Sequence, residues 1–274
     1  MKLAVLQMVS CEHRDDNLAQ AQTLLQQAAQ AGAELAVLPE YFCLIGHQDR
    51  DKLGIAEAFG EGPMQSLLAQ QARDLGLWLV AGTLPIQSPQ PDRVFNSSLV
   101  FDPQGRCVAR YDKIHLFRFN NGTEAYDEAR VLERGHAPVH FDLPSRDGHT
   151  WRVGLSVCYD LRFPELYRHY AAQGADLLLV PSAFTHTTGQ AHWEVLLRAR
   201  AIENLAYVAA AAQGGVHTNG RRTWGHSLVI DPWGRVLDQR PEGAGVVVCE
   251  IDAAALAQWR SQLPAHQHRV LACS

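Results

Sequence analysis

The chain has 274 residues, of which 47% are hydrophobic and 19% charged, so it has the composition of a globular protein and the length for one large domain. The formal net charge is −5 and no basic stripe is present, so nucleic acid is not an expected partner. No apolar run reaches the roughly 20 residues that span a membrane, so we expect no membrane partner. Neither a Cys-x-x-Cys pair nor a His-Glu-x-x-His string occurs among the 6 cysteines and 13 histidines, so we expect no metal site. The scattered cysteines predict a reducing, cytoplasmic location.

Strand and helix patterns alternate along the chain. The first strand turns polar too soon to be a signal peptide. Helices are predicted in segments rich in Ala, Leu and Gln or opened by proline, and strands in short apolar runs that end at turn residues. The predicted elements are strand 2–8, helix 17–31, strand 35–38, helix 63–75, strand 77–81, a hairpin of 97–101 with 108–111, an irregular segment 122–136, strand 153–157, helix 164–172, strand 176–180, helix 191–204, strand 206–212, a hairpin of 227–230 with 236–239, strand 246–251, helix 253–260 and a polar tail.

The two halves of the chain resemble each other. Residues 32–39 parallel 174–181, because in both a helix ends at glycine and a buried strand ends at proline. Residues 98–106 parallel 227–235, each with a strand that enters an Asp-Pro-x-Gly turn. Chance similarity of generic strand-turn strings is the alternative. Two such halves can stack their sheets and place helices outside, which predicts the α/β class as a four-layer α-β-β-α sandwich.

The segment 153–165 carries the strongest sign of chemistry. An apolar run ends at Cys158, and Pro164 soon opens a helical pattern. A cysteine on such a turn lies at the sheet edge, near the positive end of a helix dipole, which favours a thiolate nucleophile. A buried structural cysteine is the alternative.

Three further polar residues lie at positions where a polar side chain costs free energy, which makes them candidates for a catalytic role. Glu40 follows strand 35–38 among apolar neighbours, which suits a general base. Lys113 follows a strand and can stabilise an oxyanion by its charge, and Glu128 lies in the irregular segment. Solvated loop positions are the alternative for these residues. Because active sites of layered α/β folds gather at strand ends, we predict that Glu40, Lys113 and Cys158 converge in one cavity.

Three motifs, in this order, resemble those of the nitrilase (carbon-nitrogen hydrolase) superfamily. The resemblance extends over nearly the whole chain, so we expect one hydrolase domain at 1–269 and a C-terminal tail at 270–274. It implies the α-β-β-α sandwich, no cofactor, a small-molecule amide as substrate, and a homodimer formed through helices that include the one after the nucleophile. The motifs are Leu38-Pro39-Glu40, Tyr111-Asp112-Lys113-Ile114-His115-Leu116 and Val157-Cys158-Tyr159-Asp160-Leu161-Arg162-Phe163-Pro164-Glu165.

The family's catalytic residues carry over motif by motif. Its Glu-Lys-Cys triad falls on Glu40, Lys113 and Cys158. Its second glutamate falls on Glu128, which is expected to hold Lys113 or the substrate amide in place. The resemblance implies that Glu40 is the general base, that Lys113 and the backbone N–H of Tyr159 stabilise the oxyanion, and that water hydrolyses a thioester on the cysteine.

The nucleophile motif looks like that of the amidase-type Nit branch, because true nitrilases tend to have Cys-Trp-Glu where this chain has Cys-Tyr-Asp at 158–160. The stretches 210–213 and 225–227 look closest to the deaminated glutathione amidases, although Gln190 and the loop 117–122 depart from relatives. We therefore expect hydrolysis of a small carboxylate-bearing amide, with deaminated glutathione (to alpha-ketoglutarate and cysteinylglycine) ahead of other substrates. The alternatives are an omega-amidase on alpha-ketoglutaramate, a carbamoyl-amide or nitrile hydrolase, and an inactive member that acts as an interaction protein.

A substrate that carries carboxylates predicts arginines in the pocket. Arg162 is the first candidate, with an ion pair to Glu165 as the alternative. Arg221 and Arg222 lie in a glycine-rich loop and are candidates for the far end of a longer substrate, with a solvated loop as the alternative. The remaining expected substrate-binding residues are Tyr159, Phe184 (which also fits a core position) and Thr185.

Overall fold

The computed structural model describes residues 1–271 of the chain. The first half builds most of a mixed sheet, to which the second half adds one edge strand, β18. The strand order is β18-β1-β2-β3-β5-β4, with β6 and β9 also paired to β5. The central strands β1, β2 and β3 are parallel. Residues 272–274 of the expected tail, and with them Cys273, lie outside the described part. The strands are β1 (Lys2–Gln7), β2 (Leu35–Val37), β3 (Trp78–Val80), β4 (Leu84–Gln87), β5 (Val94–Phe101), β6 (Cys107–Asp112), β9 (Leu132–Glu133) and β18 (Gly245–Glu250).

The second half builds a second mixed sheet of the same plan. Its order is β10-β11-β12-β13-β16-β17, and its central strands β11, β12 and β13 are again parallel. Two short ribbons, β7 with β8 and β14 with β15, stand apart from both sheets. The strands are β7 (Arg118–Asn120), β8 (Ala125–Asp127), β10 (His140–Pro144), β11 (Thr150–Leu155), β12 (Leu177–Leu179), β13 (Tyr207–Ala210), β14 (Gly214–Val216), β15 (Arg222–Trp224), β16 (Ser227–Ile230) and β17 (Val236–Arg240).

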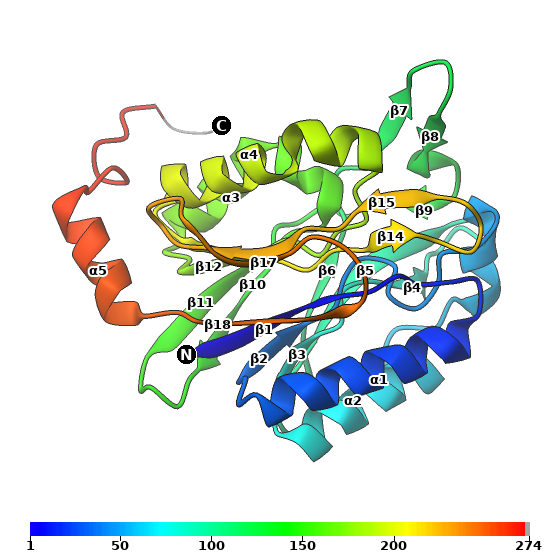
Figure 1. The fold of residues 1–274 in the computed structure, drawn as a ribbon, viewed down its shortest axis with the longest axis horizontal. Helices are drawn as coiled ribbons and strands as arrows, with labels where there is room; N and C mark the ends of the chain where they lie inside the picture. The colour runs from blue at the N-terminus through cyan, green and yellow to red at the C-terminus, as the bar shows by residue number, and fades with distance from the viewer. Residues whose placement is uncertain (272–274) are drawn as a thin grey trace.

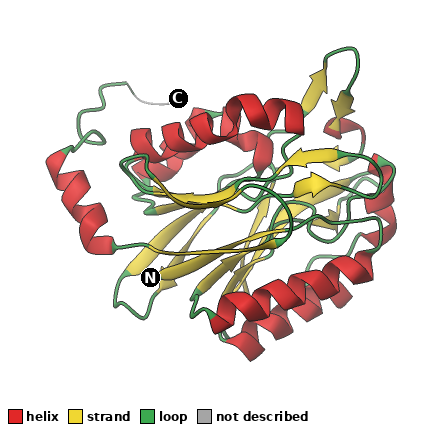
Figure 2. Ribbon diagram, in the orientation of Figure 1, coloured by secondary structure: helices red, strands yellow, loops and turns green. Residues whose placement is uncertain are grey.

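Helices cover the outer faces of the two stacked sheets (Figures 1 and 2). The pair α1 and α2 lies against the first sheet, and α3 and α4 lie on the opposite side of the molecule, over the second. The predicted four-layer α-β-β-α sandwich is therefore confirmed. The helices are α1 (Arg14–Gln30), α2 (Pro63–Leu75), α3 (Pro164–Ala172), α4 (His186–Asn204) and α5 (Ala253–Gln262), with 3-10 turns η1 (Asp49–Ile55), η2 (Glu128–Arg130) and η3 (Cys158–Arg162).

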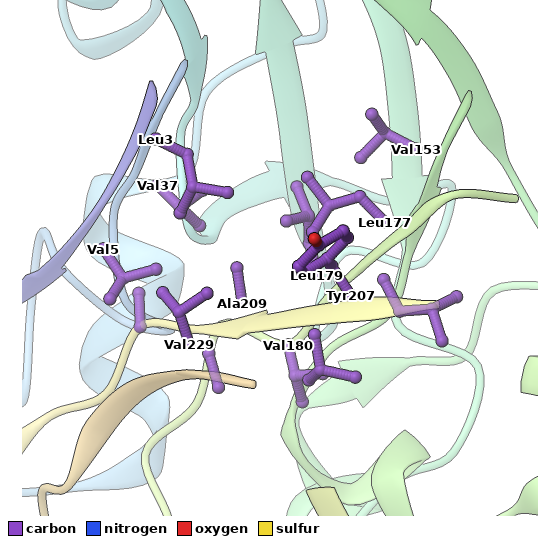
Figure 3. Close-up of a cluster of buried hydrophobic side chains, with 14 of the residues drawn as sticks. Leu3, Val5, Val37, Val153, Leu177, Leu179, Val180, Tyr207, Ala209 and Val229 are labelled. Atoms are coloured by element: carbon purple, nitrogen blue, oxygen red, sulfur yellow. The ribbon is translucent and has the colours of Figure 1, made fainter. Parts of the chain in front are cut away.

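The core lies between the sheets and is set by the alternation of side chains along each strand. Leu3 and Val5 of β1 point toward the second sheet, where they join Leu177 of β12 (Figure 3). Ala4 and Leu6 of the same strand belong instead to the cluster beneath α1 and α2. Because each fully buried aliphatic side chain contributes about 1.5–3 kcal/mol, both faces of the central strands stabilise the stack.

The turns that define the predicted internal repeat have the same geometry in both halves. The carboxylate of Asp102 accepts the N–H of Arg106 at 2.9 Å and pairs with the guanidinium of that arginine. Asp231 accepts the N–H of Arg235 at 2.9 Å and forms the equivalent ion pair. The two halves are therefore built on one local plan.

Several predicted boundaries differ from the structure. α1 begins three residues before the predicted 17, and α4 begins at His186 rather than at 191. The reason for the second difference is Thr185, whose hydroxyl caps α4 by accepting the N–H of Thr188 at 3.3 Å. The segment 122–136, predicted to be irregular, contains β8, η2 and β9, which are too short to carry a periodic pattern. The strands β4, β7, β10, β14 and β15 were not predicted.

Candidate active site

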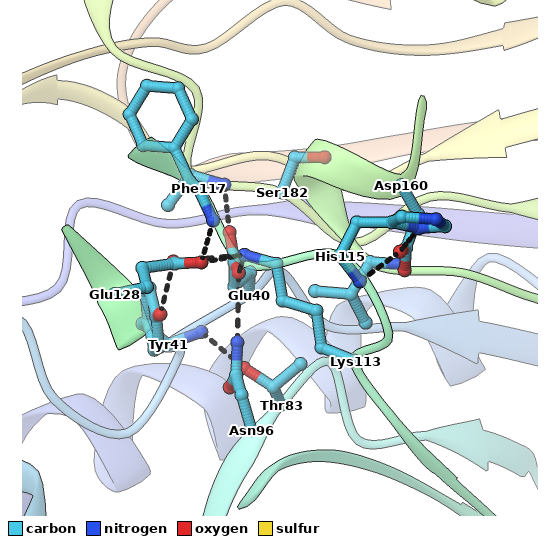
Figure 4. A network of polar contacts seen from close by, with 12 residues as sticks. Glu40, Tyr41, Thr83, Asn96, Lys113, His115, Phe117, Glu128, Asp160 and Ser182 are labelled. Atoms are coloured by element: carbon cyan, nitrogen blue, oxygen red, sulfur yellow. Dashed lines mark hydrogen bonds and ion pairs between the residues drawn. The ribbon is translucent and has the colours of Figure 1, made fainter. Parts of the chain in front are cut away.

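Lys113 lies between two carboxylates at the junction of the two sheets (Figure 4). Its Nζ is 2.9 Å from Glu40 Oε1 and 2.8 Å from Glu128 Oε2. The side chains of Lys113 and Glu40 are 0% and 1% exposed. A buried ammonium is tolerated only with such partners, so the three residues form one ionic unit.

Glu40 is held by groups from both halves of the chain. It follows β2, and its Oε1 also accepts Asn96 Nδ2 of β5 at 2.9 Å. Its Oε2 accepts the backbone N–H of Ala183, after β12, at 2.9 Å, and its own carbonyl accepts Gln213 Nε2 at 3.2 Å. The carboxylate orientation is therefore fixed before any ligand binds.

Glu128 is oriented by two further donors. Its Oε1 accepts the hydroxyl of Tyr41 at 2.8 Å, and its Oε2 accepts the N–H of Phe117 at 2.7 Å. Burial alone would raise the pKa of the Glu128 carboxyl, but the charge of Lys113 and these hydrogen bonds outweigh it and lower the pKa. Glu128 is therefore ionised, and it acts on Lys113 as a bidentate partner.

Cys158 is the first residue of the 3-10 turn η3, shortly after β11, and its backbone is strained. Its φ is 49°, in the left-handed region that non-glycine residues seldom adopt. The turn is held from below by the fully buried carboxylate of Asp160, which accepts Val157 N–H at 2.8 Å and the Tyr111 hydroxyl at 2.7 Å. Its other oxygen accepts the N–H of His115 at 3.0 Å. These contacts keep the strained conformation in place.

The sequence predicted a thiolate at Cys158, but the electrostatic surroundings of this residue favour the neutral thiol. Burial raises the pKa of the Cys158 thiol well above its ordinary value, and the charge of Glu40 adds to this, whereas Lys113 lowers it. Burial would lower the pKa of Lys113, but Glu128 and Glu40 outweigh it and raise that pKa. The favoured resting state is a neutral Cys158 thiol with the Glu128 carboxylate ionised and Lys113 as an ammonium.

A cavity of about 320 Å³ opens onto this cluster. Glu40, Glu128 and Cys158 line it, while Lys113 lies buried behind them. Its lining includes the predicted pocket residues Tyr159, Arg162, Phe184 and Thr185. The structure thus brings these residues together with the predicted triad.

Two of the three predicted arginines line the cavity and one does not. Arg162 lies with its guanidinium 6.0 Å from the ring of Tyr159 and 5.7 Å from that of Phe184, and it contacts His192 Nδ1 at 3.2 Å. Within residues 1–271 it forms no ion pair with Glu165. Arg221, in the turn before β15, lines the cavity. Arg222, the first residue of β15, does not: it is exposed and lies 3.6 Å from Glu242.

Sequence reasoning missed three residues that support the site. Tyr41 directly follows Glu40 in its motif, and Asp160 lies two residues after Cys158. Asn96 opens a run of three buried polar residues, 96–98, in the middle of β5, and such a run inside a buried strand is a signal that could have found it.

Across 1–271, no group of at least three His, Cys, Asp or Glu side chains has the arrangement of a metal site. In the same part of the chain, no helix has the length and apolar character needed to cross a membrane.

The carbon-nitrogen hydrolase family model matches residues 2–261, a range that contains the whole cluster. The chain belongs to the carbon-nitrogen hydrolase family. This carbon-nitrogen hydrolase is 40% identical to the deaminated glutathione amidase of Yersinia enterocolitica over 97% of its own length and 92% of that protein. It is 37% identical to the omega-amidase NIT2 of Danio rerio, over 98% of this chain and 94% of that one.

Among solved structures, the NitFhit protein of C. elegans superimposes on this carbon-nitrogen hydrolase with a TM-score of 0.89 at 38% identity. The match covers 98% of this chain and 64% of that one. The fold and the family thus agree with the geometry of the cluster.

Proposed function

We propose that this carbon-nitrogen hydrolase is a thiol amidase that cleaves a small carboxylate-bearing amide through a thioester on Cys158. The observation that carries the proposal is the buried unit of Lys113 with Glu40 and Glu128 beside a cavity that Cys158 lines. Relatives named deaminated glutathione amidase, at 40% and 41% identity, support deaminated glutathione as the substrate. The products are then alpha-ketoglutarate and cysteinylglycine.

Acylation begins with the neutral thiol. Because its pKa is raised, Cys158 needs a base, and Glu40 takes the thiol proton as Sγ bonds to the amide carbon. The C=O electron pair moves onto oxygen, where the Lys113 ammonium and the backbone N–H of Tyr159 stabilise the negative charge. The first N–H groups of a helical turn have no partner within it, which leaves that donor free for the oxyanion.

Glu40 then donates this proton to the leaving group. It protonates the amide nitrogen as the C–N bond breaks, so that an amine departs and a thioester remains. Water next gives a proton to Glu40 while its oxygen bonds to the thioester carbon. The C–S bond breaks, the thiol recovers the proton, and a carboxylic acid is released. One carboxylate thus serves as base and acid in both halves of the reaction.

Arg162 binds the carboxylate on the acyl side of the substrate. It lines the cavity beside Tyr159 and Phe184, and among residues 1–271 it has no acidic ion-pair partner. A guanidinium of this kind matches a carboxylate in a bidentate geometry. Thr185 also lines this cavity.

The experiment compares deaminated glutathione, alpha-ketoglutaramate, a carbamoyl amide and a nitrile, with release of alpha-ketoglutarate, cysteinylglycine or ammonia as the readout. We expect the highest kcat/KM for deaminated glutathione, no turnover by Cys158→Ala, and unchanged turnover by Cys107→Ala, whose cysteine is exposed. A higher kcat/KM for alpha-ketoglutaramate identifies the omega-amidase that the Danio rerio relative supports. Turnover of only the carbamoyl compound or the nitrile contradicts the proposal, and no turnover at all favours an interaction protein.

We also propose that the enzyme is a cytoplasmic homodimer that pairs through α3 and α4. Two apolar side chains of α4, Val195 and Ile202, are 70% and 48% exposed, which supports a face covered by a second copy. The cysteines described within 1–271 are all free, which fits a reducing compartment.

A further inference from the structure

We propose that Arg221 binds a carboxylate on the leaving amine, so that the enzyme prefers amides whose nitrogen carries a carboxylate-bearing group over primary amides. The inference rests on the proposed amidase function and assigns the second end of its substrate. Arg162 and Arg221 then act as two anion-binding poles, one for each fragment of the cleaved molecule.

A second cavity continues the first away from the nucleophile. It has a volume of about 350 Å³ and shares Tyr41, Phe117, Glu128 and Arg221 with the first. Cys158 and Arg162 line only the first cavity, so a substrate attacked at Cys158 would reach the second cavity with the part that lies beyond the scissile bond.

Arg221, which lines both cavities, has a hydrogen-bond donor without a partner. Its side chain is half-buried, its guanidinium lies 5.2 Å from the ring centre of Tyr126, and its buried Nε has no hydrogen-bond partner. No carboxylate within residues 1–271 lies within ion-pair distance of it. A buried donor without an acceptor costs free energy, and a ligand carboxylate would remove that cost.

The acidic residues that line the second cavity are already paired. Glu128 is bound by Lys113, and Asp49 lies 3.7 Å from Lys52. The third, Asp127, is near Arg118 at 4.0 Å and Arg130 at 3.8 Å. None of these carboxylates therefore neutralises Arg221.

Lys52 adds a second positive charge to the same cavity. Its Nζ lies 4.7 Å from the ring centre of Tyr41, and it lines the second cavity together with Arg221. Burial lowers the pKa of Lys52, and the charge of Arg221 lowers it further. Two cations that repel each other across a shared space are stabilised by an anion between them.

Backbone hydrogen bonds fix the position of Arg221 in the turn before β15. Its N–H donates to Asn219 Oδ1 at 2.9 Å and its carbonyl accepts the N–H of His217 at 2.8 Å, so the turn before β15 is fixed. His217 is itself buried against Ser10 and Thr223. The next residue, Arg222, faces Glu242 on the exposed side and supplies a matched control.

The kinetic test measures kcat/KM of the full-length enzyme with deaminated glutathione, whose leaving amine ends in a carboxylate, and with alpha-ketoglutaramate, which releases ammonia. Arg221→Gln should lower the value for deaminated glutathione about 10–100-fold, the effect of one charged hydrogen-bonded pair, and leave alpha-ketoglutaramate within about twofold. Arg162→Gln should lower both, and Arg222→Gln neither. An equal effect of Arg221→Gln on the two substrates, or no effect on either, overturns the inference.

A binding measurement decides the point without turnover. In Cys158→Ala protein, calorimetry compares deaminated glutathione with the same molecule amidated at its C-terminal carboxylate. The carboxylate form should bind about 10–100-fold more tightly; Arg221→Gln should abolish the difference, and Arg222→Gln should keep it. Equal affinity of the two forms overturns the inference. A wild-type enzyme that binds with this preference yet does not hydrolyse deaminated glutathione contradicts the proposed function instead.

Discussion

Asp160 accepts the backbone N–H of Val157 at 2.8 Å, which ties the residue before the nucleophile to a carboxylate with no exposed surface. The same carboxylate also accepts the Tyr111 hydroxyl and two donors of His115, its N–H and its Nδ1. The strained position of Cys158 thus depends on one buried acid that does not line the cavity.

Asp160→Asn should therefore weaken both stability and activity. One carboxylate oxygen becomes an NH₂ group that faces donors, and each donor left without an acceptor costs about 1–3 kcal/mol of the free energy of unfolding. Urea unfolding and kcat are the measurements. Asp142→Asn, which removes an exposed pair with Arg152, should cost less than about 1 kcal/mol. Equal stability of the two variants would contradict this role.

Glu128→Gln should reduce turnover by acting on Lys113. With one counter-charge lost, the effect of burial on Lys113 is opposed chiefly by Glu40, so the pKa of Lys113 falls relative to the wild type. We expect kcat to drop about 10²–10³-fold, as when an oxyanion donor is lost. The remaining activity should also disappear at a lower alkaline pH than in the wild type, because Lys113 gives up its proton sooner. Glu194→Gln on the surface of α4 should change neither quantity, and an unshifted alkaline limb in Glu128→Gln would refute the argument.

The raised pKa of the Cys158 thiol predicts its ionisation state directly. A thiol is neutral below its pKa, so raising the pKa keeps Cys158 protonated throughout the neutral range and ionises it only above the ordinary value for a thiol. The difference in ultraviolet thiolate absorbance between wild type and Cys158→Ala, followed as a function of pH, isolates this residue from the other cysteines. We expect no difference signal near neutral pH; a thiolate signal there would show that Lys113 prevails over burial.

A substitution at Gly82 tests whether the backbone next to Glu40 must keep its position. Gly82 has a φ of 48°, and an added Cβ would lie 2.0 Å from the carbonyl oxygen of Pro39, the residue before Glu40. Gly76, at the end of α2, also has positive φ but has no atom within 4 Å of an added Cβ. Gly76→Ala should cost about 1–2 kcal/mol through conformation alone, whereas Gly82→Ala should cost more and also lower kcat by moving Glu40. Similar unfolding free energies and kcat values in the two variants would be evidence against this close contact.

Val195→Glu tests the proposed dimer. A charge on the exposed apolar face of α4 should separate the subunits, because pairing would bury it without a partner. Light scattering after size-exclusion chromatography measures the mass in solution. Val216→Glu changes an equally exposed valine, 67% against 70%, on β14 and should leave the dimer intact. A dimer that persists in Val195→Glu excludes this face.

The sequence predicted the long elements and the convergence of the cluster because both follow from local rules. α2 and α3 have the predicted bounds, since proline opens each of them. The elements that were missed are short ribbons such as β7 and β14, which lack room for a periodic pattern.

The ionisation state of Cys158 could not be predicted without the three-dimensional structure. The sequence places a lysine near the thiol, but the effect of burial relative to that lysine depends on how the two sheets close over the site. Likewise, the adjacent arginines at 221 and 222 look alike in the sequence. The structure distinguishes them, because Arg221 in the turn before β15 lines the cavity and Arg222 on β15 is exposed beside Glu242.

Cys158 shares its backbone conformation with Tyr41, at φ 49° and 56°, and both residues line the same cavity. Glycine would adopt either conformation without the penalty of about 1–2 kcal/mol that other residues incur. A redesign of this chain for thermal stability alone would therefore favour glycine at two positions where the reaction needs a sulfur and a phenol. Robustness and catalysis make opposite demands on those two positions.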